Sequence, residues 1–105
     1  MPGNQQAYQK FMDQGNSAAW EKNWDQAARY YQLALEEMPA QPAALTSLGL
    51  AFFELQVFDK ALEVYTQAVK AAPNDPAPYD KIGRIQEQNG RIAEAVKSWL
   101  AAADL

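Results

Sequence analysis

The sequence contains no cysteine and no histidine among its 105 residues. Disulfides, thiol nucleophiles, the commonest general base and the commonest metal ligands are therefore unavailable. No glycine-rich phosphate loop is present, and Glu36, Glu37 and the scattered aspartates are interpreted as solvated helix residues rather than an acid–base pair. We therefore expect no enzyme activity, no cofactor and no metal site.

Positive charge is scarce and scattered. Nine Lys and Arg face thirteen Asp and Glu, for a net charge of −4, and the basic residues lie dispersed from Lys10 to Lys97. Binding to phosphates or anionic lipids needs clustered positive charge, so we expect no nucleic-acid partner. The longest apolar run, Leu48–Phe53, is far short of the roughly 20 residues that span a bilayer. The N-terminus also lacks the basic start and apolar run of a secretory signal, and we expect a cytoplasmic protein without membrane insertion.

The most informative feature of the sequence is a period of 34 residues. Gly15, Gly49 and Gly83 each lie 34 positions after the last. Further residues follow the same step: Ala27, Ala61 and Ala95; Tyr31, Tyr65 and Trp99; Ala34, Ala68 and Ala102; Pro39 and Pro73. Periods of this length are typical of stacked repeats, each of which buries its apolar face against its neighbours.

Each period predicts a pair of amphipathic helices. After a polar lead-in over residues 1–7, the units span about 8–41, 42–75 and 76–105, and apolar residues recur in each at helical spacing. About six helices follow. Helices of this length are marginal alone in water, so they must pack on one another. A glycine inside a helix costs about 1 kcal/mol, so three glycines in register predict close approach of the paired helix.

Polar residues and prolines mark the expected helix starts. Asp25 and Asp59 are expected to cap the second helices of the first two units. Pro42 is expected in the first turn of its helix, and Asn74–Pro76 reads as a cap followed by a proline at the first helical position.

The middle unit carries the clearest pattern: Leu48, Gly49, Phe52, Phe58, Ala61, Tyr65, Ala68 and Pro73. These residues and the 34-residue spacing resemble the tetratricopeptide repeat (TPR) family over essentially the whole chain. The first unit departs from the pattern at Gln14 and Ala18, and the third departs at Gln86 and lacks the closing proline. The resemblance implies an all-α fold, a right-handed solenoid of three helical hairpins.

The resemblance also implies a protein–protein interaction module. In TPR arrays the first helices of the hairpins line a concave groove, which would bind a peptide or helix of a partner protein. Alignment to the family leaves these groove positions free of packing: Asn16, Trp20, Leu50, Phe53, Glu54, Lys81 and Arg84. Trp20 and Phe53 either anchor a ligand side chain or fill gaps between helices. Lys81 and Arg84 either meet an acidic peptide or belong to a charged face in which Asp80 pairs with Arg84.

One TPR subclass clamps the C-terminal carboxylate of chaperone tails with lysines, an arginine and asparagines. The matching positions in this sequence are Met12, Asn16, Ser47, Ala77 and Lys81. Because Asn16 and Lys81 alone agree with that subclass, we expect the chain not to be a chaperone-tail clamp.

The pattern is still helical where the sequence ends. The last unit of a repeat array normally needs a polar capping element, yet the apolar residues of this end have none after them: Val96, Trp99, Leu100, Ala103 and Leu105. We expect the chain to be a piece of a longer repeat protein, unless a partner or a second copy covers this end. The second functional hypothesis is therefore a self-associating structural array, a homo-oligomer that docks or exchanges its last helix through Val96, Trp99, Leu100 and Leu105.

Overall fold

The computed structural model describes residues 4–88, 97 and 101. This part of the chain holds five helices and no strand: α1 (Gln5–Trp20), α2 (Trp24–Glu37), α3 (Pro42–Glu54), α4 (Phe58–Ala71) and α5 (Ala77–Gln88). The prediction of an all-α fold is confirmed. Lys97 and Ala101 are helical as well.

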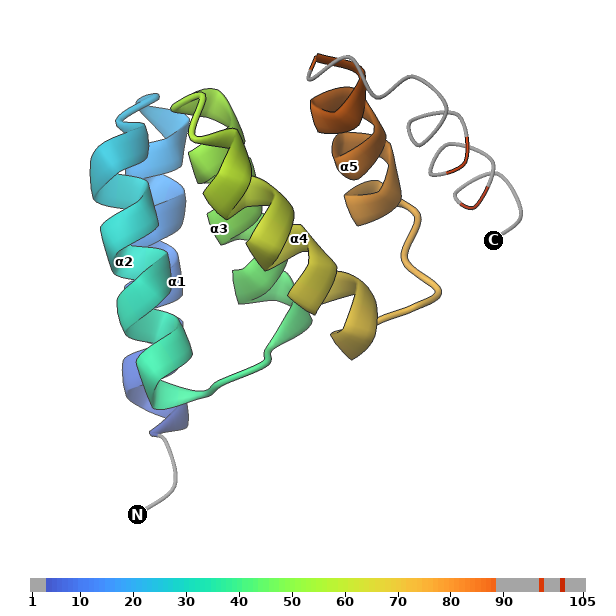
Figure 1. The fold of residues 1–105 in the computed structure, drawn as a ribbon. Helices are drawn as coiled ribbons and strands as arrows, with labels where there is room; N and C mark the ends of the chain where they lie inside the picture. Colours follow the sequence, from blue (N-terminus) through green and yellow to red (C-terminus); the bar gives the residue numbers. More distant parts are fainter. Residues whose placement is uncertain (1–3, 89–96, 98–100, 102–105) are drawn as a thin grey trace.

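The helices form consecutive hairpins (Figure 1). Helix α1 packs on α2 and α3 packs on α4 within the hairpins, while α2 packs on α3 and α4 on α5 between them. We call α1 with α2 the first pair and α3 with α4 the second pair. In Figure 1, α2 and α4 lie in front of α1 and α3, so each layer of the solenoid contains one helix of each pair. No helix in the described range is long and apolar enough to cross a membrane.

Much of the expected sixth helix falls outside the described residues. So do Val96, Trp99, Leu100 and Leu105, on which the self-association hypothesis depends. That hypothesis stays a prediction. A mass by light scattering that equals one chain at every concentration would contradict it.

The second helix of each pair begins earlier than the aspartates predicted. Helix α2 begins at Trp24 after Asn23, whose Oδ1 accepts from the backbone nitrogen of Gln26 at 3.4 Å. Helix α4 begins at Phe58 after Val57 and has no side-chain cap. Asp25 and Asp59, predicted as caps, instead lie in the first turns of these helices. A carboxylate in the first turn still interacts favourably with the helix dipole.

The early starts follow from the turns that precede these helices. Lys22 and Gln56, which are 34 positions apart, have left-handed backbone conformations with φ of 61° and 63°. A residue in this conformation ends the preceding helix and reverses the chain at once. The next helix therefore starts two residues later.

The predicted prolines have different outcomes. Pro42 lies in the first turn of α3, as predicted. Helix α5 begins one residue after Pro76, so that proline precedes the helix instead of opening it. The Oδ1 of Asp75 accepts from the backbone nitrogen of Ala77 at 3.1 Å and so binds one of the free amides of the first turn.

The glycines of the period are the points of closest approach between paired helices. A Cβ on Gly15 would lie 2.6 Å from Cε1 of Tyr31, and a Cβ on Gly49 would lie 2.7 Å from Cε1 of Tyr65. Carbon atoms in contact are normally about 3.5–4.0 Å apart, so only glycine leaves room for each ring. The prediction of close approach is confirmed for both. Gly83 is also buried, but the residue that the period matches to these tyrosines, Trp99, lies outside the described residues.

Candidate functional site: the face of the first helices

Helices α1, α3 and α5 lie side by side along one face of the solenoid. The Tyr31 hydroxyl donates to Oδ1 of Asn16 on α1 at 2.7 Å and also hydrogen-bonds Ser47 on α3. Further along, Nζ of Lys81 on α5 lies 4.7 Å from the ring centroid of Phe53 on α3. We call the surface shared by these three helices the groove face. Of the seven groove residues that the resemblance implied, Asn16, Leu50, Phe53 and Lys81 take part in the contacts or the hollow between these helices, whereas the place of Trp20, Glu54 and Arg84 on this face stays a prediction.

The junction of α1 and α3 is polar and satisfied. The ring of Tyr31 crosses Gly15, and its hydroxyl reaches Asn16 and Ser47 on the groove face. Burial raises the pKa of Tyr31, and the hydrogen bond with Ser47 partly opposes that shift. We call this trio of Tyr31, Asn16 and Ser47 the first junction.

The junction of α3 and α5 contains a hollow of about 280 Å³. Its lining comes from three helices: Thr46, Ser47, Leu50, Tyr65, Ala77, Asp80 and Lys81. The period of 34 matches Tyr65 to Tyr31, Leu50 to Asn16 and Lys81 to Ser47. We call Tyr65, Leu50 and Lys81 the second junction. It replaces the acceptor Asn16 with an aliphatic side chain and Ser47 with a cation.

Tyr65 is more deeply buried than Tyr31, at 1% exposure against 3%. Burial raises the pKa of Tyr65 far above its usual value, and the negative charge of Glu54 raises it further. Within residues 4–88, no hydrogen bond uses the Tyr65 hydroxyl. The family resemblance predicts Leu50 and Lys81 in the groove, whereas Tyr65 was predicted to serve packing alone. The matched positions of Asn16 and Leu50 are the signal that could have found it.

Trp20 and Phe53 differ in their surroundings. Trp20, the last residue of α1, is 89% exposed and therefore fills no gap between helices. Phe53 is half-buried and packs edge-to-face against Phe58 with ring centroids 5.6 Å apart, beneath the ammonium of Lys81. Gap filling therefore describes Phe53, whereas Trp20 is exposed.

The charged residues of α5 include one ion pair. Arg84 Nε lies 3.0 Å from Asp80 Oδ2, and both side chains are about half exposed, at 57% and 48%. Lys81 forms no ion pair with the residues of the described range. Glu54 is exposed on α3. Across residues 4–88, no three acidic side chains gather in a way that could hold a metal ion.

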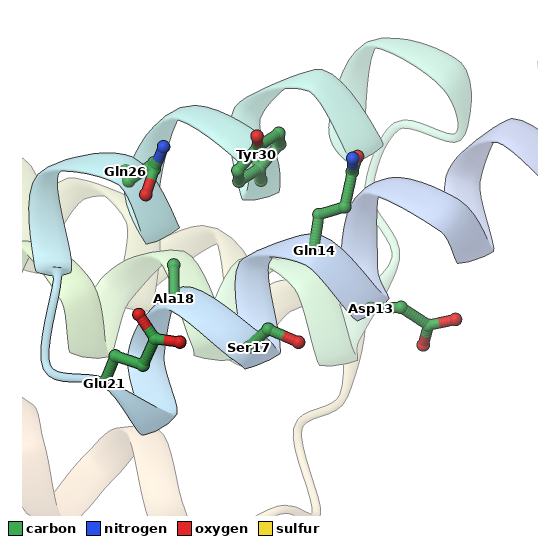
Figure 2. A pocket seen from close by; sticks show the side chains of 7 residues that line it. All are labelled: Asp13, Gln14, Ser17, Ala18, Glu21, Gln26 and Tyr30. Atoms are coloured by element: carbon green, nitrogen blue, oxygen red, sulfur yellow. The ribbon is translucent and has the colours of Figure 1, made fainter.

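A second hollow, of about 340 Å³, lies on the first pair, between α1 and α2 (Figure 2). Six of the seven residues that line it carry a polar side-chain group: Asp13, Gln14, Ser17, Ala18, Glu21, Gln26 and Tyr30. The Oε1 atom of Gln14 is buried there without a hydrogen-bond partner. The period matches Gln14 to Leu48 and Ala18 to Phe52, which are buried at 4% and 8% exposure. The first pair thus has a polar and a small residue where the second pair has two large apolar ones. The second pair packs on neighbours on both sides, α3 on α2 and α4 on α5, whereas the first pair has one such neighbour in the described range.

The comparisons with known proteins agree with this geometry. A family model described as tetratricopeptide repeat matches residues 12–76, more than half of the chain. The chain is 29% identical over 86 residues to small glutamine-rich tetratricopeptide repeat-containing protein 2 of Mycosarcoma maydis, a match that covers 82% of this chain and 24% of that protein. The chain thus spans about a quarter of the length of this curated relative.

Two solved structures show the same fold. The TPR domain of Arabidopsis OM64 superposes with a TM-score of 0.91 at 27% identity, over 95% of this chain and 83% of that one. The second TPR domain of Spaghetti (RPAP3), bound to the HSP90 peptide SRMEEVD, superposes with a TM-score of 0.89 at 21% identity, over 96% of this chain and 93% of that one. With the 34-residue period and the paired helices, these matches show that the chain belongs to the tetratricopeptide repeat family.

Proposed function

We propose that the chain is a protein–protein interaction module that binds an extended or helical segment of a partner protein on the groove face. The observation that carries this proposal is the exposure of Trp20, at 89%, together with the hollow of the second junction. Binding energy in protein interfaces is concentrated in a few large side chains, and tryptophan is enriched among them. Asn16, Leu50, Phe53, Glu54, Lys81 and Arg84 complete the proposed surface.

The structural neighbours support a role in binding. The RPAP3 domain holds an HSP90 peptide, so a domain with this fold can bind a short segment of another protein. A catalytic role has no comparable support. A cytoplasmic location, expected from the sequence, is part of this proposal. Met12 and Ala77 stand where the chaperone-tail subclass has lysines, so the proposed partner segment is of another kind.

A library of random peptides displayed on phage and selected on the immobilised chain tests this proposal. Peptides that bind should lose at least tenfold in affinity when Trp20→Ala and Arg84→Ala are combined, because the pair removes an anchor and a cation from opposite ends of the groove face. Trp20 is preferable to Phe53 for this test because Phe53 also packs against Phe58.

The matched control carries Glu63→Ala and Lys70→Ala, which change exposed residues of α4. Both double variants should keep the helicity and melting temperature of the original chain, since all four positions are exposed. Selected peptides that bind the groove variant and the control equally would remove the groove face from the proposal.

A further inference from the structure

The two junctions of the groove face have the same architecture and opposite hydrogen-bonding states. Tyr31 crosses Gly15 and donates to Asn16 at 2.7 Å. Tyr65 crosses Gly49 in the same way, so the period places its hydroxyl beside Leu50, the residue matched to Asn16. Leucine cannot accept a hydrogen bond. The second junction therefore presents a donor that the described part of the chain leaves unused.

The unused donor is available to a ligand that enters the hollow. Tyr65 as a whole is only 1% exposed, and the exposure that remains leaves its hydroxyl open to the hollow, where water or a ligand atom can bind it. The hollow that Tyr65 lines is where a partner atom would enter.

The size and lining of the hollow indicate what enters it. Its volume of about 280 Å³ lies at the lower edge of the roughly 300–1,000 Å³ of small-molecule sites. Leu50, Ala77 and the Tyr65 ring give it apolar walls. A single aliphatic side chain fits such a space.

The charges around the hollow favour a neutral occupant. Glu54 is close enough to raise the pKa of Tyr65, and Asp80 is paired with Arg84 at 3.0 Å. The ammonium of Lys81 already lies over the Phe53 ring. Two negative and two positive groups thus surround the site, so it offers no net attraction to a carboxylate.

We propose that the hollow between α3 and α5 seats one aliphatic side chain of a partner peptide, and that a backbone carbonyl of this peptide accepts a hydrogen bond from the Tyr65 hydroxyl. This assignment rests on the proposed function, because it names the anchor residue of the segment that the groove face binds. It also distinguishes the two junctions: the first is closed by its own hydrogen bonds, and the second is the specificity site.

Nuclear magnetic resonance titrations with three small probes test the assignment. N-acetyl-leucine methylamide carries the side chain and neutral carbonyls, N-acetyl-glycine methylamide lacks the side chain, and N-acetyl-leucine carries a carboxylate. We expect the leucine methylamide to shift the backbone resonances of Leu50, Thr46 and Ala77 saturably, with a dissociation constant in the millimolar range typical of so small a ligand. The glycine probe should give no saturable shift, and the carboxylate probe should bind more weakly than the leucine methylamide.

Two variants and one control separate the hydrogen bond from the packing. Tyr65→Phe keeps the ring over Gly49 and should weaken binding of the leucine methylamide by about 3- to 10-fold, the range for one lost hydrogen bond. Leu50→Asn recreates the first junction, supplies an internal acceptor and should abolish binding. The matched control, Tyr31→Phe, should bind the probe as the original chain does.

Absence of a saturable shift at the hollow would overturn the assignment, and so would unchanged binding by Tyr65→Phe or tighter binding of the carboxylate probe. The outcome is separable from that of the proposed function. If the Trp20 and Arg84 variant loses the selected peptides while the hollow variants keep them, the groove face stands and the hollow is not its anchor site. If the selected peptides bind all variants equally, the proposed function fails as well.

Discussion

In the first pair, the ring of Tyr31 lies over Gly15, and in the second pair the ring of Tyr65 lies over Gly49. The two helices of each pair thus pack on one another through the same contact. Away from this contact the pairs differ: Asn16 is matched by Leu50, and Gln14 of the first pair is matched by the buried Leu48 of the second. The comparison separates two kinds of residue. Some are the same in both pairs because the fold requires them, and others differ because each pair has different neighbours in the solenoid.

The largest effect is expected from a change to the shared contact. Gly49→Ala would place a Cβ 2.7 Å from a ring that is 1% exposed and cannot move aside. Overpacking of this kind costs about 1–3 kcal/mol, which the better helix propensity of alanine offsets by up to about 1 kcal/mol. Urea unfolding should show the loss.

The control is a double-mutant cycle. In a chain that already carries Tyr65→Ala, the added Gly49→Ala should be neutral or stabilising, because the ring is gone. Gly15→Ala should show the same coupling with Tyr31→Ala. If Gly49→Ala lowers the free energy of unfolding equally with and without the Tyr65 ring, the contact with that ring is not the reason that position 49 requires glycine.

A smaller effect is expected in the hollow between α1 and α2. Gln14→Leu introduces the residue of the second pair and removes an Oε1 that is buried without a partner. Relief of such an unsatisfied group should raise the free energy of unfolding by about 1 kcal/mol. Gln26→Leu is the matched control, since Gln26 is exposed and already accepts from Asn23 at 3.0 Å. A gain for Gln26→Leu that equals that for Gln14→Leu would show that added apolar surface alone is responsible.

A smaller effect still is expected on the free energy of unfolding at alkaline pH, where Tyr65 ionises. The pKa of Tyr65 is raised above the usual value of 10.0 in the folded chain. Above about pH 10 the unfolded chain releases this proton while the folded chain keeps it, so stability is present below that pH and falls as the pH rises. Chemical unfolding at pH 9 and pH 11 should show a loss that Tyr65→Phe reduces. A loss of the same size in the Tyr65→Phe variant would show that Tyr65 is not its source.

No effect is expected from a chaperone-type peptide. A peptide that ends in Glu-Glu-Val-Asp should give no binding heat in calorimetry, because Met12 and Ala77 stand at two of the lysine positions of the clamp subclass. Low-micromolar binding of this peptide would contradict that expectation and would weaken the contrast drawn between the two junctions.

The sequence was sufficient to predict helical hairpins and the close approach of the paired helices at Gly15 and Gly49. Glycine, alanine and tyrosine recur every 34 residues because packing requires a residue of a given size at the same position of each hairpin. The caps were harder to predict. Asp25 is as good a cap as Asn23 by residue type, and the choice depended on the left-handed turn at Lys22, a conformation that lysine does not signal.

The groove face was predictable in outline and not in detail. Alignment placed Trp20, Phe53 and Lys81 on one face, but it could not show that Lys81 lies over the Phe53 ring while Trp20 stays exposed. Tyr65 escaped notice because its ring belongs to the core and its hydroxyl reaches the surface. A residue with both roles is assigned to one of them when its position along the chain is the sole guide.

The matched turns at Lys22 and Gln56 have a consequence for how such a protein can evolve. They give the two hairpins the same reversal and the same start for the following helix, with φ values of 61° and 63°. The packing of the two helices within each pair is therefore set at the turns and at the glycine contacts, away from the exposed residues of the groove face. Mutations on that face can accumulate while the hairpins keep their geometry, so the exposed residues can change without loss of the fold.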